Sequence, residues 1–159
     1  MICEFLSDSP QATRELGQRI GAAVVPPAII LLEGELGAGK TLFTKGLYEG
    51  FGGKDVDSVV SPSYTLVHHY DAGGRSFYHV DLYRLENPDH ILGLEYEEFL
   101  YLHTGLSVIE WPRSLRDLLS PDDYLEIKIA HGDNAEHRKF IFNASGSQYA
   151  DALASVKSS

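Results

Sequence analysis

The hydrophobic pattern in the first third of the chain predicts alternating strands and helices. Ala28–Leu32 is a continuous apolar run between a proline pair and a glycine-rich segment. A short run of this kind is typical of a strand buried on both faces of a parallel sheet. The flanking patterns predict a strand over 3–6, a helix that begins near Ser9-Pro10 and ends before Pro26-Pro27, and a second helix from Thr41 to about Phe51.

The rest of the chain alternates short strands with short helices. Tyr64–Tyr70 and Ser76–Tyr83 are rich in aromatic and β-branched residues, and the glycine-containing turn between them predicts a β-hairpin. Further strands are predicted over 106–109, 125–129 and 139–143, helical segments over 87–102, 114–119 and 149–156, and a frayed tail from about 157. The pattern predicts an α/β fold, a three-layer sandwich with a mixed, largely parallel central sheet plus a β-hairpin.

Length and composition predict a single domain over residues 1–159. Apolar residues make up 43 % of the 159, which is enough for one buried core. No apolar run approaches the ~18 residues that cross a bilayer, and the N-terminus lacks the pattern of a secretory signal. Cys3 is the only cysteine, so no disulfide can form within the chain. We therefore expect a cytoplasmic protein with no membrane partner.

The balance of charge argues against direct binding to nucleic acid. The chain carries 23 acidic and 13 basic side chains, for a formal net charge of −10. Autonomous nucleic-acid binders usually present a basic surface to the phosphates, and the densest basic spot here is Arg138-Lys139. DNA is therefore not expected as a partner, and RNA would be held by another subunit. An acidic surface that keeps the protein soluble accounts equally well for the charge alone.

Residues Gly34–Thr41 carry the Walker A pattern Gly-x-x-x-x-Gly-Lys-Thr, which defines a P-loop. A predicted buried strand precedes the motif and a predicted helix follows it, as a P-loop NTPase-like fold requires. Glycines let the backbone N–H groups turn toward phosphates, and the helix N-terminus attracts the same anion. Lys40 would reach the β- and γ-phosphates, and the Thr41 hydroxyl would bind Mg²⁺. The predicted contacts to the nucleotide are Glu35, Leu36, Gly37, Ala38, Gly39, Lys40, Thr41 and Leu42.

Two carboxylates end predicted strands and are candidates for the acidic partner of a P-loop. Glu110 follows the apolar run Leu106–Ile109, and Asp81 follows a more polar run. A P-loop needs a carboxylate for Mg²⁺ and a group that positions the attacking water. Taken alone, either residue could equally be a strand-end carboxylate that faces solvent. Because the guanine-recognition signature Asn/Thr-Lys-x-Asp is absent, we expect ATP rather than GTP as the substrate.

Four segments resemble the TsaE family, also called YjeE, the bacterial ATPases required for threonylcarbamoyladenosine modification of tRNA. They are Gly34–Thr41, Ser61–Val67, His79–Leu85 and Ile109–Pro112. The likeness extends from about residue 11 to about residue 138. The resemblance implies an ATPase that is weak alone and acts with TsaD and TsaB, so that tRNA is reached only indirectly through the complex. One family motif, a short acidic one, is shifted in this chain, over 93–99.

The resemblance also implies roles for individual residues. Asp81 matches the family's functional aspartate and Glu110 its metal-associated glutamate, so Lys40, Asp81 and Glu110 are the predicted catalytic group. Thr41 and Glu110 are the expected Mg²⁺ ligands, with Asp81 either assisting the metal or positioning the water. A switch-like segment and a nearby aromatic are implied at Ser61, Ser63, Tyr64, Thr65 and Trp111, and further nucleotide contacts at Ser9 and Arg138. A core tryptophan and a solvated arginine are the alternatives for Trp111 and Arg138.

Other chemistries find less support in the sequence. His68 and His69 are adjacent on a predicted strand, so they point to opposite faces and do not form a metal cage. Two alternative functions stay open beside the ATPase. One is a small-molecule P-loop kinase, although no arginine-rich lid is evident. The other is an ATP-dependent interaction switch that does not hydrolyse, against which Asp81 and Glu110 argue mildly.

Overall fold

A computed structural model describes residues 1–62, 67–83, 97–100 and 104–157. The strands are β1 (Ile2–Ser7), β2 (Ala28–Glu33), β3 (Val67–Ala72), β4 (Arg75–Asp81), β5 (Leu106–Glu110), β6 (Leu125–His131) and β7 (Arg138–Ala144). The α-helices are α1 (Pro10–Ala23), α2 (Lys40–Gly50), α4 (Glu97–Leu100) and α5 (Ala150–Lys157). Short 3₁₀ helices cover Val56–Ser58, Arg113–Leu118, Pro121–Asp123 and Ser147–Tyr149.

All seven strands form one mixed sheet in the order β1-β7-β6-β2-β5-β4-β3. The four central strands, β6, β2, β5 and β4, are mutually parallel, whereas β1, β7 and β3 join antiparallel. Strand β2 is buried along nearly its whole length, as its apolar run predicts. The carboxyl ends of β2, β5 and β4 therefore meet at one edge of the sheet, where ligands bind in open α/β folds.

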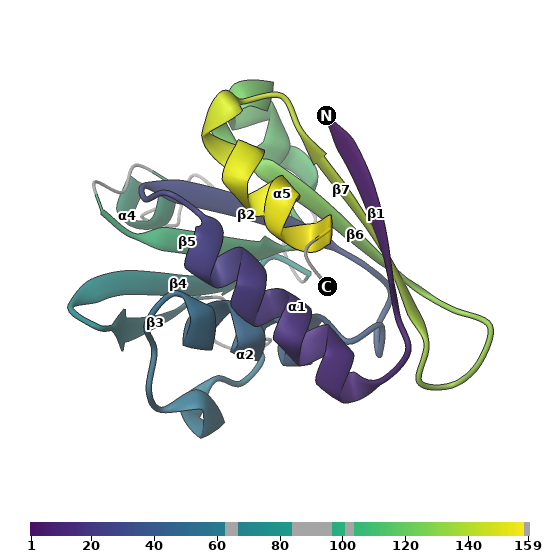
Figure 1. The fold of residues 1–159 in the computed structure, drawn as a ribbon. Coiled ribbons are helices and arrows are strands. Elements are labelled where there is room, and N and C mark those ends of the chain that lie inside the picture. Colours follow the sequence, from purple (N-terminus) through teal and green to yellow (C-terminus); the bar gives the residue numbers. More distant parts are fainter. Residues whose placement is uncertain (63–66, 84–96, 101–103, 158–159) are drawn as a thin grey trace.

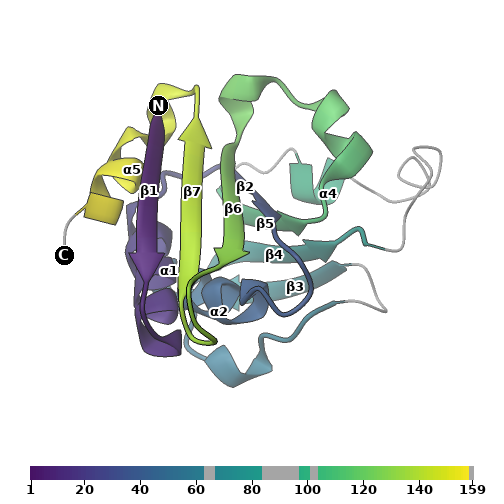
Figure 2. The ribbon, with the colours of Figure 1, turned by 90° about the vertical axis from the view of Figure 1, so that its right-hand side faces the viewer.

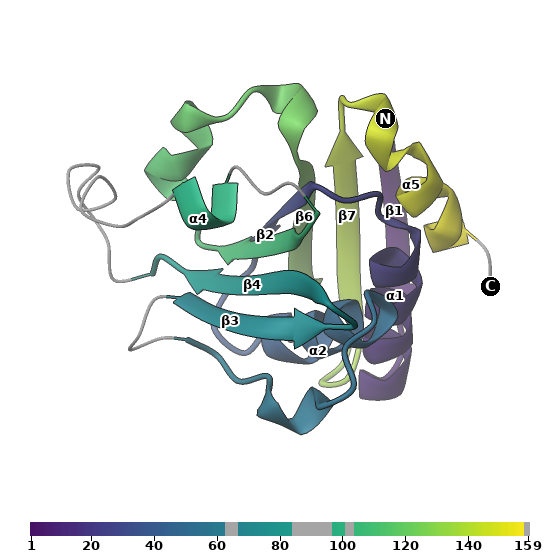
Figure 3. The ribbon, with the colours of Figure 1, turned by 90° about the vertical axis from the view of Figure 1, so that its left-hand side faces the viewer.

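Helices α1, α2 and α5 cover one face of the sheet and enclose the larger core (Figure 1). Their apolar side chains pack on alternate residues of the strands, among them Ile30, Val108 and Phe142. The other face carries a smaller core around Leu31, Val80 and Ile109. Helix α4 contacts β5 and adds Phe99 and Leu100 to this smaller core. Figure 3 shows α4 near the end of the sheet that is formed by β4 and β3. The predicted α/β sandwich is confirmed: α1, α2 and α5 lie on one face, and α4 is the α-helix that the described residues place on the other.

At the end of the sheet formed by β1, β7 and β6, one face is not covered by any helix of the described residues. In Figure 2, β1, β7 and β6 face the viewer with no described helix in front of them, and α1, α2 and α5 lie behind. On this face Ile2 and Leu6 are 72 % and 73 % exposed.

In the part of the chain that the structure describes, no helix combines the length and the apolar character needed to cross a bilayer.

Most of the predicted elements are present, with small shifts in their ends. Ser9 caps α1, because its Oγ accepts a hydrogen bond from the Ala12 N–H at 3.1 Å. The hairpin turn is tighter than predicted, since only Gly73 and Gly74, both with positive φ, lie between β3 and β4. The predicted 114–119 helix is a 3₁₀ helix over Arg113–Leu118. Most of the predicted 87–102 helix, the 93–99 acidic motif except for part of α4, and the tail beyond 157 lie outside the described residues.

Helices α1 and α2 approach so closely that their contact is built from glycines. A Cβ added at Gly17 would lie 2.5 Å from the Phe43 carbonyl oxygen, and one at Gly46 would lie 2.2 Å from the Arg14 carbonyl oxygen. Gly21 and Gly50 meet the facing backbone in the same way. Since α2 begins at the predicted P-loop, this contact sets the position of the loop relative to the sheet.

We expect Gly17→Ala to lower the free energy of unfolding by about 1 to 2 kcal/mol, because backbone displacement costs more than the gain in helix propensity. Urea denaturation followed by circular dichroism measures the change. Ala22→Ser, at an exposed position of the same helix, is the control and should change stability by less than about 0.5 kcal/mol. A stability equal to that of the unmodified protein would show that the helices separate at little cost.

Candidate functional site

The strand order brings the two candidate carboxylates side by side. Asp81 on β4 pairs in register with Glu110 on β5, and Glu110 pairs with Leu32 on β2, just before the glycine-rich loop. Residues paired in adjacent parallel strands point to the same face of the sheet. Both carboxylates are therefore on the α2 side and close to the loop, although 29 residues separate them in the sequence (110 − 81).

The glycine-rich loop, residues 34–39, joins β2 to α2 in the arrangement that the motif predicts. Gly37 and Gly39 have φ values of 78° and 100°, which residues with a side chain adopt only with strain. Gly39 stands at the N-cap of α2 and, being a glycine, offers no side chain to cap this helix end. The positive end of α2 thus receives no side-chain cap from its own N-cap residue, an arrangement suited to an anion.

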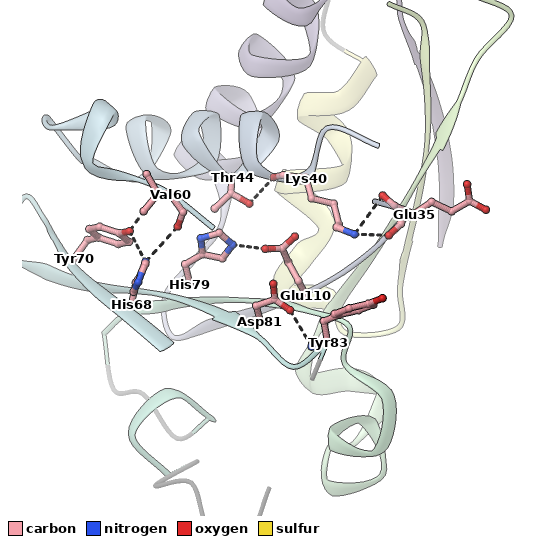
Figure 4. A network of polar contacts seen from close by, with 11 residues as sticks. Glu35, Lys40, Thr44, Val60, His68, Tyr70, His79, Asp81, Tyr83 and Glu110 are labelled. Carbon is pink, nitrogen blue, oxygen red and sulfur yellow. Dashed lines mark hydrogen bonds and ion pairs between the residues drawn. The ribbon is translucent and has the colours of Figure 1, made fainter. Parts of the chain in front are cut away.

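Lys40, the first residue of α2, turns its side chain back over the loop. Its Nζ donates hydrogen bonds to the carbonyl oxygens of Gly34 and Glu35, the second at 3.4 Å (Figure 4). The same nitrogen lies 4.2 Å from the centre of the Trp111 ring. Burial lowers the pKa of Lys40 from its ordinary value, while the negative charges of Glu110 and Asp81 act in the opposite direction. The ammonium group thus lies against the glycine-rich loop and within electrostatic reach of two carboxylates.

Glu110 and Asp81 are both almost fully buried, at 2 % and 5 % exposure. Glu110 Oε2 lies 2.6 Å from Nε2 of His79, a residue that is itself completely buried. Asp81 Oδ1 accepts a hydrogen bond from the Tyr83 N–H at 2.9 Å. The alternative that these are carboxylates facing solvent is therefore wrong. Buried carboxylates beside a P-loop lysine suit a bound divalent cation.

Trp111 follows Glu110 directly and has a φ of 55°, the only positive φ among the described non-glycine residues. This conformation costs about 1 to 2 kcal/mol for a residue with a Cβ. The indole packs against the Tyr83 ring at 5.0 Å between centres and is partly exposed, so Trp111 is not a core tryptophan. Strain of this kind is typical of functional sites. Here it turns the ring toward Lys40.

These groups line one cavity of about 340 Å³. Its walls are formed by Leu36, Gly37, Gly39, Lys40, Thr41, Leu42, Ser61, Asp81, Glu110 and Trp111. The volume is within the range of small-ligand sites. A larger hollow of about 450 Å³ is also lined by Trp111, but its lining includes neither Lys40 nor the carboxylates of Asp81 and Glu110. The smaller cavity therefore has the donors for phosphate and metal.

The donor set of this cavity fits Mg²⁺ held jointly with a nucleotide. Thr41 supplies a hydroxyl, and Asp81 and Glu110 supply carboxylates. Within the described residues, no three His, Cys, Asp or Glu side chains gather as a metal cage. Mg²⁺ is usually bound through one or two carboxylates together with substrate phosphates and water, rather than by a complete protein cage.

Arg138, at the start of β7, binds the outside of the glycine-rich loop. Its Nε donates to the Ala38 carbonyl oxygen at 2.9 Å, and one terminal nitrogen donates to the Gly37 carbonyl oxygen at 3.3 Å. A small pocket of about 90 Å³ lies beside it, lined by Pro10, Thr13, Gly39, Leu42, Ala135, Glu136 and Arg138. The alternative of a solvated arginine is therefore wrong. Arg138 and Ser9, which caps α1 next to this pocket, stay predicted nucleotide contacts.

The structure describes the positions of some of the other predicted residues but not of all. Glu35 and Leu36 are exposed, although Leu36 also lines the cavity, and Ala38 is buried. Ser61 reaches the cavity, while the switch residues Ser63, Tyr64 and Thr65 lie outside the described residues. His68 binds Tyr70 and the Val60 carbonyl oxygen, and His69 stacks on Tyr78, so the two histidines do point to opposite faces.

His79 was not among the predicted site residues, although the sequence contained a signal for it. It precedes Asp81 by two positions, and residues two apart on a strand share a face. A polar residue on the same face as a functional carboxylate, next to a buried strand, is a reasonable candidate for contact with the site. Its actual partner, Glu110, belongs to another strand and could not be identified in this way.

Comparison with known proteins places this geometry in a family. The family model described as threonylcarbamoyl adenosine biosynthesis protein TsaE matches residues 7–140. The protein "tRNA threonylcarbamoyladenosine biosynthesis protein TsaE" of Bacillus subtilis is 36 % identical over 142 residues, covering 89 % of this chain and 85 % of the relative. The protein of the same name from Nostoc sp. is 38 % identical over 140 residues, covering 86 % and 83 %.

A solved structure has a similar fold over nearly the whole chain. It is described as the crystal structure of Bacillus subtilus YdiB and superposes with a TM-score of 0.80 at 26 % sequence identity. The match covers 99 % of this chain and 95 % of the other. The mixed sheet with its mostly parallel centre is thus found in an experimental structure as well.

Proposed function

This chain belongs to the TsaE family, and from that premise we propose that it is the Mg²⁺-dependent, ATP-hydrolysing subunit of tRNA threonylcarbamoyladenosine biosynthesis. The family's role lies in that pathway. The observation that carries the proposal is the convergence of the glycine-rich loop, Lys40, Asp81 and Glu110 on one cavity. A loop for phosphate, a buried ammonium group and two carboxylates are the parts that nucleotide hydrolysis uses.

Each part has a defined task in the proposed reaction. The N–H groups of the loop and of the first turn of α2 bind the phosphates, and Lys40 exchanges its bonds with Gly34 and Glu35 for bonds to the β- and γ-phosphates. Thr41 and Glu110 would hold Mg²⁺, which neutralises charge on the phosphates when bound. Asp81 either holds a metal-bound water or orients the attacking water.

The charges that line the cavity are consistent with slow ATP hydrolysis by the isolated chain. Lys40 is the only cation among its described lining residues, and the Arg138 guanidinium is engaged by loop carbonyl groups. Transition states of phosphoryl transfer often need a further positive group that a partner supplies. We therefore propose that TsaD and TsaB complete the site. The net charge of −10 agrees with tRNA being held by those partners rather than by this chain. A cytoplasmic location stays a prediction.

The first experiment compares steady-state ATP hydrolysis by the purified chain with and without TsaB and TsaD of the same organism. We expect the partners to raise the rate at least about tenfold, because they complete the charge around the phosphates. The Lys40→Ala variant serves as the blank and should show no stimulated rate. Phosphate release is measured in parallel with transfer to candidate metabolites.

Three results would contradict the proposal. Rapid hydrolysis by the chain alone, unchanged by TsaB and TsaD, would remove the partner-dependent mechanism. Transfer of phosphate to a metabolite instead of water would favour the small-molecule kinase. Tight Mg·ATP binding with no hydrolysis under any of these conditions would instead favour a non-hydrolysing ATP-dependent switch.

A further inference from the structure

His79 occupies a buried position where a histidine lowers the stability of the fold, so its presence there calls for a functional reason. It lies on β4, between β5 and the edge strand β3, and none of its surface is exposed. Its Nε2 lies 2.6 Å from Glu110 Oε2, while its Nδ1 is buried and has no hydrogen-bond partner among the described residues. Burying a polar atom without a partner destabilises a fold. An apolar side chain at this position would avoid that cost.

The hydrogen bonds determine which ring nitrogen carries the proton. A carboxylate only accepts, so Nε2–H donates to Glu110, and we assign this tautomer to His79. Nδ1 is then an unpaired acceptor. The contact is therefore a directional hydrogen bond to one oxygen of Glu110.

This bond limits how the Glu110 carboxylate can rotate. With Oε2 held by His79, Oε1 is the oxygen available to a ligand in the cavity that Glu110 lines. His79 also lies on the same strand and the same face as Asp81, two residues away, so the bond ties β4 to β5 at the level of both carboxylates. Figure 4 shows His79 and Glu110 joined beneath α2, with Asp81 next to Glu110.

We propose that His79 is a positioning residue that orients Glu110 for the Mg²⁺ bound with ATP. The inference rests on the proposed function, because it concerns the metal of that site. Groups that hydrogen-bond a metal ligand fix its geometry, and losing one typically weakens metal affinity or activity by about 10- to 100-fold. His79 would thus act on the metal through Glu110 without touching the substrate.

The test replaces His79 by two residues that differ in hydrogen bonding. In His79→Gln the side-chain amide nitrogen takes the place of Nε2 and keeps a donor toward Glu110. In His79→Leu the donor is lost and the buried volume stays filled. The readout is equilibrium binding of ATP at increasing Mg²⁺ concentration, followed by the fluorescence of Trp111, the only tryptophan, whose ring lies 4.2 Å from Lys40 Nζ.

We expect His79→Leu to raise the Mg²⁺ concentration at half-maximal binding by about 10- to 100-fold and His79→Gln by less than about threefold. ATP binding without Mg²⁺ should be equal in all three proteins, because the loop and Lys40 carry it. The thermal midpoint of His79→Leu should fall, because Glu110 Oε2 is left buried without its donor, whereas that of His79→Gln should stay close to the unmodified value. His69→Leu, at an exposed histidine on β3, is the matched control and should change nothing.

The outcomes separate this inference from the proposed function. Absence of Mg²⁺-dependent ATP binding in the unmodified protein would overturn both. Binding by the unmodified protein with an unchanged Mg²⁺ requirement in His79→Leu would overturn the positioning role alone. If His79→Leu does not fold, His79→Asn replaces it, since its shorter amide does not reach Glu110. An Asn variant equal to the Gln variant would then overturn the role.

Discussion

Lys40→Ala is expected to lower partner-stimulated ATP hydrolysis at least about 100-fold. The buried ammonium group is the only cation among the described residues that line the cavity, so its loss leaves the phosphates facing Asp81 and Glu110 with less positive charge. ATP binding should weaken as well, because in the proposed reaction Lys40 would contact the nucleotide both before and during phosphate transfer. Phosphate release and equilibrium nucleotide binding measure the two effects separately.

The fold of Lys40→Ala should stay intact, since the side chain bonds to loop carbonyl groups and not to the sheet. Lys45→Ala is the matched control, because Lys45 lies on the same helix but outside the cavity lining. We expect it to hydrolyse ATP at the unmodified rate. Equal loss in both variants would indicate that general damage to α2, and not the ammonium group at the loop, explains the result.

Glu110→Gln is expected to lower hydrolysis by a similar factor, at least about 100-fold, through the metal. The amide keeps the size of the side chain, and its oxygen can still accept the hydrogen bond from His79. The negative charge that Mg²⁺ requires is lost. We therefore expect the Mg²⁺ concentration for half-maximal rate to rise strongly, with little change in the free energy of unfolding. Rates measured across Mg²⁺ concentrations provide the test.

Asp81→Asn shows how the two carboxylates divide their work. A raised Mg²⁺ requirement would place Asp81 with the metal, whereas a lower kcat at an unchanged Mg²⁺ requirement would place it with the attacking water. Asp117→Asn, at an exposed aspartate, controls for the loss of one negative charge.

A Glu110→Gln variant that hydrolyses ATP normally at low Mg²⁺ would contradict the metal role of Glu110.

Local patterns were sufficient for the elements and for the loop. The apolar run at Ala28–Leu32 is a buried parallel strand, and the alternation at Leu125–Ile129 is a strand with one covered face. The spacing of Gly34, Gly39, Lys40 and Thr41 identified the loop without reference to the fold. These signals are readable because backbone periodicity and glycine requirements act over a few neighbouring residues. Ser9 was recognised as the start of α1 for the same reason.

Contacts between distant segments were decided only by the tertiary structure. The sequence predicted that Asp81 and Glu110 end strands, but their pairing depends on β4 lying next to β5. Three other contacts depend on strand order and helix packing in the same way. They are the hydrogen bond from His79 to Glu110, the hydrogen bonds from Arg138 to the loop carbonyl oxygens, and the close backbone contact at Gly17. Each joins residues at least 26 positions apart (43 − 17), the shortest being Gly17 to Phe43.

The sequence alone thus determined which chemical groups this protein carries and on which kind of element each one lies. The tertiary structure determined which groups meet, and therefore which carboxylate has a buried histidine as its partner and which arginine holds the loop. The physical reason is that a strand's hydrophobic pattern specifies its buried face but not its neighbour. Neighbours are selected by the packing of the whole sheet against its helices, which no short segment encodes.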